Sequence, residues 1–127
     1  MHKKWSINML PIVDANVILR YLLNDVEEQS EYAKKVIEQG CEITAEVLAE
    51  VVYVLKGVYQ VPKEEISALL TALLDIVYLD RHAEAVYALE LFKTKSLDFV
   101  DCLLAAQHMV SDRKIITFDK KLNMIVG

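Results

Sequence analysis

Two aspartates in this sequence each directly follow a short apolar run. Asp14 follows residues 10–13, and Asp119 follows residues 115–118. If both runs are strands of a parallel sheet, both carboxylates lie at the carboxyl ends of the strands. In open parallel sheets this edge is where ligands bind. The two side chains are therefore the first candidates for chemistry.

Two further carboxylates are placed to join them. Asp101 falls in the first turn of a helix expected over residues 98–112, which enters from the same neighbourhood. Glu50 lies on a helix expected over residues 46–59. It falls about 100° from Val51, the centre of the apolar stripe, and so borders the buried face.

Each of these residues also has a purely structural explanation. Asp14 and Asp119 both precede helical segments, where an aspartate can accept backbone N–H groups as an N-cap. Asp101, with Asp98 three residues before it, suits a capping box or a helix-dipole partner. Glu50 can be a solvated residue at the flank of its helix.

The carboxylates taken together are harder to explain by structure alone. Like charges in close proximity cannot all ionise without compensation from protons or a divalent cation. All-oxygen ligands without His or Cys suit Mg²⁺ or Mn²⁺ rather than zinc. Such a cluster, holding one or two ions, is suited to hydrolysing phosphodiester bonds. No Ser/His/Asp or Cys/His set offers a competing nucleophile.

The elements that must position these residues alternate along the chain, which predicts an α/β protein with a parallel sheet covered on both faces. Expected strands cover residues 10–13, 42–44, 76–79 and 115–118, with a possible fifth at 124–126. Expected helices cover residues 16–23, 27–39, 46–59, 62–75, 81–93 and 98–112, with a short turn or helix at 119–122.

Composition sets limits on this interpretation. The 127 residues, of which 54% are hydrophobic, suit a single domain over residues 1–127 and exclude disorder. No apolar run is long enough to span a membrane, and the short one after the basic N-terminus does not fit a signal peptide. Cys41 and Cys102 form no CxxC motif, which favours a reducing, cytoplasmic location. The net charge of −5 argues against a passive nucleic-acid binder.

Four segments, in order, resemble the motifs of PIN domains. They are Val13 to Arg20 with Asp14, Leu48 to Val52 with Glu50, Asp98 to Ala106 with Asp101, and Thr117 to Asp119. The resemblance extends over about residues 10 to 126. Ala15 stands where Thr or Ser is common in the family.

This resemblance implies a compact α/β/α sandwich with a short central sheet of four to five strands. It also implies a Mg²⁺- or Mn²⁺-dependent endoribonuclease, in which Asp14, Glu50, Asp101 and Asp119 form the catalytic and metal-binding set. Asn16, Thr117 and Asp98 match supporting positions. Short single-domain members resemble VapC toxins of toxin–antitoxin pairs, so an antitoxin is an expected partner.

RNA is the expected substrate, and Arg20, Lys120 and Lys121 are candidate contacts for it. Without the four site carboxylates the net charge would be about −1, so the remaining surface is nearly neutral. Surplus apolar residues favour a homodimer. The alternatives are a receiver-like signalling module, a catalytically silent PIN-like binding domain, and a housekeeping nuclease without an antitoxin.

Overall fold

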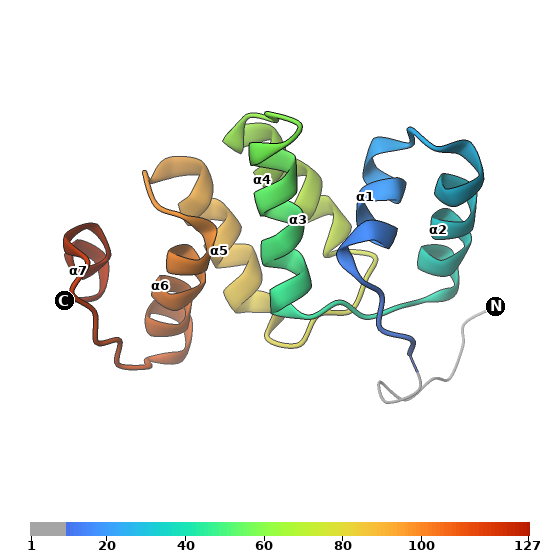
Figure 1. The fold of residues 1–127 in the computed structure, drawn as a ribbon. Coiled ribbons are helices and arrows are strands. Elements are labelled where there is room, and N and C mark those ends of the chain that lie inside the picture. The colour runs from blue at the N-terminus through green and yellow to red at the C-terminus, as the bar shows by residue number, and fades with distance from the viewer. Residues whose placement is uncertain (1–9) are drawn as a thin grey trace.

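The computed structural model describes residues 10–127, and their secondary structure is helical (Figure 1). The expected helices are all present, with ends that shift by at most two residues, except that the last one continues four residues beyond its expected end. In chain order they are α1 (Ala15–Leu23), α2 (Glu27–Gln39), α3 (Ala45–Gly57), α4 (Lys63–Leu73), α5 (His82–Thr94), α6 (Phe99–Ser111) and α7 (Lys120–Val126).

Side-chain caps fix the start of three helices. The Asp14 carboxylate accepts a hydrogen bond from the N–H of Val17 at 3.1 Å, which caps α1. Thr44 caps α3 in the same way, and Asp119 caps α7 by accepting from the N–H of Leu122 at 2.8 Å. Each cap satisfies a backbone donor that has no partner inside its helix.

The predicted α/β/α sandwich with a central parallel sheet is wrong for the described residues. Between residues 10 and 127 the backbone forms only two isolated parallel bridges, Ile12 to Glu42 and Glu42 to Tyr78. Residues 115–118 belong to no helix or strand and pair with no described backbone, and residues 124–126 belong to α7. The basic N-terminal segment that does not fit a signal peptide begins in residues 1–9, outside the residues that the structure describes.

The physical reason is that the helices bury their apolar faces mainly against one another. The closest helix pairs are α5 with α6, α1 with α2, and α4 with α5. Each expected strand has only three or four residues, too few to form a ladder once the neighbouring helices are packed. The two bridges are all that remains of the expected sheet in the described residues.

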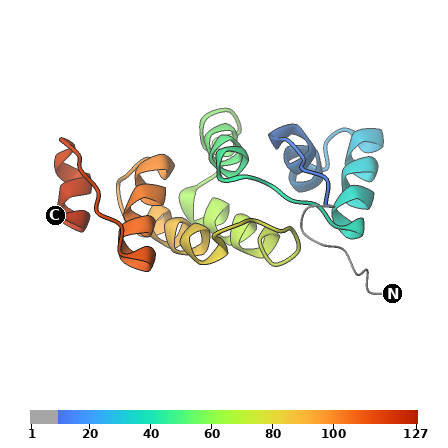
Figure 2. The same cartoon turned by 90° about the horizontal axis from the view of Figure 1, so that it is seen from below.

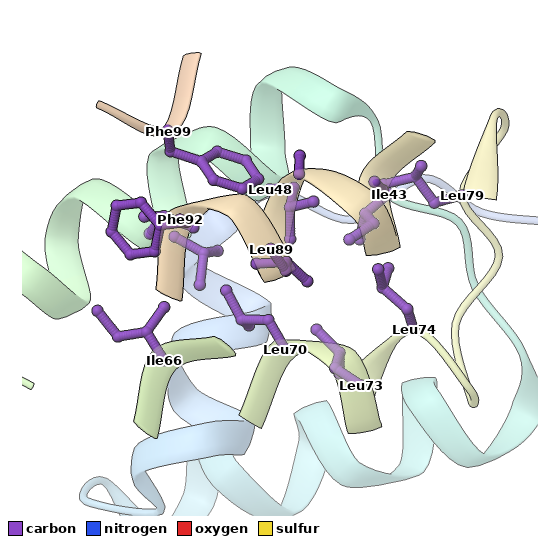
Figure 3. Close-up of a cluster of buried hydrophobic side chains, with 14 of the residues drawn as sticks. Ile43, Leu48, Ile66, Leu70, Leu73, Leu74, Leu79, Leu89, Phe92 and Phe99 are labelled. Atoms are coloured by element: carbon purple, nitrogen blue, oxygen red, sulfur yellow. The ribbon is translucent and has the colours of Figure 1, made fainter. Parts of the chain in front are cut away.

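The core lies between α3, α4, α5 and the start of α6 (Figure 3). Leu48 of α3, Leu70 of α4 and Leu89 of α5 are completely buried there. Phe92 meets Phe99 edge to face, with 5.8 Å between ring centroids. Because Phe99 is the first residue of α6, this contact positions the segment that carries Asp98 and Asp101.

The molecule is elongated, with its two helical ends far apart (Figures 1 and 2). α1 and α2 form one end, whereas α7 forms the other and packs on α6. None of the helices in residues 10–127 is long and apolar enough to cross a bilayer.

Both cysteines are free thiols buried in the core. Burial raises the pKa of Cys41, and it raises the pKa of Cys102 to about 11. Thiolates are the reactive form, so the native protein should react with a thiol reagent at pH 8 at least about 10-fold more slowly than the urea-unfolded chain. A colorimetric thiol assay measures both rates. Equal rates would show that these side chains are accessible.

Candidate functional site

Three aspartates share one hollow between the start of α6 and the start of α7. Asp98, Asp101 and Asp119 line it, and its volume is about 280 Å³. Asp98 occupies the N-cap position of α6, yet its side chain makes no capping hydrogen bond. Its carboxylate is therefore not committed to the helix end. The hollow is completed by Ser96, Leu97, Lys120 and Lys121.

The three carboxylates of this hollow lie close enough to affect one another's ionisation. Burial raises the pKa of Asp101, and the negative charges of Asp119 and Asp98 raise it further. The ionised form of Asp101 is thus disfavoured by its surroundings. Lys121 also lines the hollow, and its Nζ lies 3.5 Å from both the carbonyl and the hydroxyl oxygen of Ser96.

Asp14 lies elsewhere in the molecule. It is exposed at the start of α1, towards the end of the molecule opposite α7 (Figure 1). It lines two adjoining hollows between α1 and α2, with volumes of about 650 and 660 Å³. Glu50 is exposed in the middle of α3 and lines neither of these hollows.

The supporting residues divide in the same way. Asn16 and Arg20 line the 660 Å³ hollow with Asp14, and Arg20 forms an ion pair with Asp25 at 3.0 Å. Thr117 belongs to the other group, because its hydroxyl accepts a hydrogen bond from the N–H of Asp119 at 3.0 Å. Thr117 therefore shapes the turn that presents Asp119.

The structure thus brings together Asp98, Asp101 and Asp119, with Lys120 and Lys121 beside them, and leaves Asp14 and Glu50 apart. Sequence reasoning did not single out Ser96, which lies in a loop where no spacing pattern marks it. Its nearness to Lys121 follows only from the packing of α7 on α6.

The side chains of the hollow are of the type that binds a divalent cation, but they do not converge on one point. All of their charged donors are carboxylate oxygens, the ligands that Mg²⁺ and Mn²⁺ prefer. The repulsion that raises the pKa of Asp101 is what a bound cation relieves. Nevertheless, in the described part of the chain no three His, Cys, Asp or Glu side chains converge closely enough to hold an ion.

Comparison with known proteins identifies the family. The PIN domain model matches residues 12–126, and the chain therefore belongs to the PIN domain family. Proteins of this family are generally nucleases and typically use divalent metal ions. Searches of curated proteins and of solved structures returned no match.

Proposed function

We propose that this protein is a metal-dependent endoribonuclease. The observation that carries the proposal is the hollow shared by Asp98, Asp101 and Asp119, in a chain that matches the PIN domain over residues 12–126. A carboxylate cluster beside two lysines suits a phosphodiester better than a neutral substrate. The lysines attract the phosphate, and the carboxylates provide the ligands for a cation.

Asp101 and Asp119 would hold the metal, with Asp98 as an additional ligand. Asp14 and Glu50 lie outside this hollow, and their place in the proposed set comes from the PIN-domain motifs that they match. When bound, Mg²⁺ or Mn²⁺ would supply an activated water and would stabilise charge on the phosphate. Lys120 and Lys121 would orient the RNA backbone by ion pairing, which makes binding salt-sensitive. Cleavage would leave a 5′-phosphate and a 3′-hydroxyl.

Asp14→Asn tests whether the distant carboxylate takes part. Asparagine still caps α1, because its side-chain oxygen accepts the N–H of Val17, so the helix should be retained. We expect cleavage of single-stranded RNA with Mg²⁺ or Mn²⁺ to fall by about 100-fold, the loss typical of a missing charged group in a site. Asp75→Asn, at an exposed aspartate outside the three hollows just described, is the control. Equal cleavage by wild type and Asp14→Asn would show that Asp14 takes no part in the reaction.

We further propose that the protein is a VapC-like toxin controlled by an antitoxin. The support is electrostatic, because an acidic hollow suits a partner segment that inserts a cationic side chain. Expression of the protein alone should arrest growth, and co-expression with a small protein encoded next to it should relieve the arrest. An Asp101→Asn chain should not arrest growth. Normal growth on expression of the active wild type would favour a housekeeping RNA-processing role.

A further inference from the structure

A separate hollow lies between the second half of α3 and the start of α6, and we call it the α3–α6 pocket. Tyr53, Lys56 and Gly57 of α3 line one side of it, and Asp98 and Phe99 line the other. Its volume is about 340 Å³. Asp98 lines the acidic hollow as well, so the two hollows adjoin at this residue. Whatever binds in the pocket therefore lies next to the candidate site.

The lining of the pocket suits a flat aromatic ring. Phe92 and Phe99 are almost fully buried, and they form its apolar floor (Figure 3). Tyr53 lines the pocket as well but is 75% exposed, so much of its ring is free for a further contact. Stacking of bases on such aromatic side chains is a main source of affinity for single-stranded nucleic acids.

Gly57 keeps the side of the pocket at the end of α3 free of a side chain. It is the last residue of α3, where glycine is less favourable than alanine. Its backbone does not require glycine, because the glycine with a positive φ in the described residues is Gly40. No neighbour requires glycine either, since a Cβ at Gly57 would meet no atom within 4 Å. The space that a side chain would occupy is therefore left for a ligand.

The charges around the pocket suit a nucleotide. Lys56 is exposed and forms no ion pair within residues 10–127. It follows Tyr53 by three residues, so the two side chains are neighbours on the surface of α3. A base stacked on Tyr53 can therefore have a phosphate of its own strand paired with Lys56. Glu50 precedes Tyr53 by three residues, which places this carboxylate of the PIN-domain motifs beside the pocket as well.

The size of the pocket favours a single ring system over a protein segment. Its volume of about 340 Å³ is at the lower end of the range for small-molecule sites, roughly 300–1,000 Å³. A docked helix needs a groove that accepts anchor residues over about two turns. The pocket extends only from the second half of α3 to the first residues of α6. One base with its attached backbone fits this space better than a helix does.

We propose that the α3–α6 pocket binds one base of single-stranded RNA, beside the phosphate that enters the acidic hollow. Tyr53 stacks on the base, and Lys56 pairs with a phosphate of the same strand. The lining is mostly apolar, so the pocket recognises the face of a base rather than its edge, and it prefers a purine modestly. The position of this base beside the cleaved bond rests on the proposed nuclease function, whereas base binding does not.

Equilibrium binding of two oligomers, at low salt and with EDTA to prevent metal-dependent cleavage, tests the pocket. One is an oligoadenylate, and the other is an abasic oligomer with the same number of phosphates. We expect wild type to bind the oligoadenylate about 10-fold more tightly, which corresponds to one stacking contact. Tyr53→Ala should bind the two oligomers with similar affinity. Lys56→Gln should weaken both equally, because a lysine that contacts phosphate is indifferent to the base.

Matched variants separate the pocket from the rest of the surface. Tyr53→Phe keeps the ring and should keep the 10-fold ratio. Gly57→Leu should remove the ratio by occupying the space at the end of α3, whereas Gly57→Ala, which adds only a methyl group, should keep it. Tyr59→Ala removes an exposed aromatic residue just beyond α3 and outside the pocket, so it should keep the ratio too. Circular dichroism of each variant verifies folding.

Equal affinities for the two oligomers in wild type, no binding of the oligoadenylate, or a ratio that survives Tyr53→Ala would overturn the proposal. If Tyr53→Ala retains RNA binding but no longer responds to the co-expressed neighbouring protein, the pocket holds a protein partner and the proposal is wrong. Absence of RNA cleavage would remove the proposed nuclease, yet the affinity ratio would still test the pocket. Where cleavage occurs, wild type should prefer a purine at one fixed position beside the cut, and Tyr53→Ala should lose this preference.

Discussion

Asp101→Asn is expected to reduce RNA cleavage by about 100-fold or more without reducing the stability of the protein. A missing charged ligand costs several kcal/mol of transition-state stabilisation, and each 1.4 kcal/mol is about tenfold in rate. Asparagine has nearly the same shape and keeps one oxygen donor. The loss should therefore come from the missing charge rather than from altered packing.

The stability prediction follows from the sign of the pKa shift. Burial and the charges of Asp119 and Asp98 raise the pKa of Asp101 in the folded protein, so folding favours its protonated form. The stability that this proton contributes is lost as the pH rises through the folded pKa. At pH 7 the neutral asparagine should make the protein as stable as wild type or more so.

Urea unfolding and RNA cleavage, measured on the same preparations, test both parts. Asp75→Asn serves as the control for the loss of one exposed negative charge. A variant with lower stability than wild type would assign Asp101 a structural role. Undiminished cleavage would remove it from the catalytic set.

The helices could be predicted from the sequence because their signals are local. Residues 27–39 show a helical period that ends at Gly40, and α2 has those bounds. The proposed capping by Asp14 and Asp119 is confirmed, because both carboxylates accept a backbone N–H three residues on. Such patterns require only a few neighbouring residues.

The absence of a sheet could not be predicted, because the composition of a four-residue apolar run does not show which segment, if any, it pairs with. Residues 76–79 have the composition of a buried strand, but they contribute only Tyr78 to the bridges. Residues 115–118 have the same composition and yet expose Ile116 and Phe118. Strand pairing depends on contacts between distant segments, and in this chain helix packing determines them.

Only the part of the candidate site that depends on neighbouring residues could be predicted from the sequence. Asp98 and Asp101 are one turn apart, and the packing of α7 on α6 adds Asp119 to them. Asp14 was expected nearby because a parallel sheet would have aligned its strand with residues 115–118, and because the PIN-domain motifs include it. Since that sheet is not formed within the described residues, Asp14 lies apart from the hollow of Asp98, Asp101 and Asp119.

Phe92→Ala should destabilise the protein by about 3–5 kcal/mol, the range for removing a buried aromatic side chain. Phe92 is 1% exposed and packs edge to face on Phe99. Lys63 also lies over its ring, with Nζ 4.6 Å from the centroid. Truncation therefore removes apolar burial, an aromatic pair and a cation–π contact, and it leaves a cavity that the surrounding helices fill only in part.

Urea unfolding measures this loss against Tyr53→Ala, an aromatic truncation on α3 where the side chain is 75% exposed. The control should change the free energy of unfolding by no more than about 0.5 kcal/mol. Phe92→Leu keeps most of the apolar volume but not the ring, and it should fall between the two. Because Phe92 supports the residue that begins α6, cleavage by Phe92→Leu below its unfolding transition should decrease as well. Similar unfolding free energies for Phe92→Ala and Tyr53→Ala would mean that the α5–α6 contact is not part of the core.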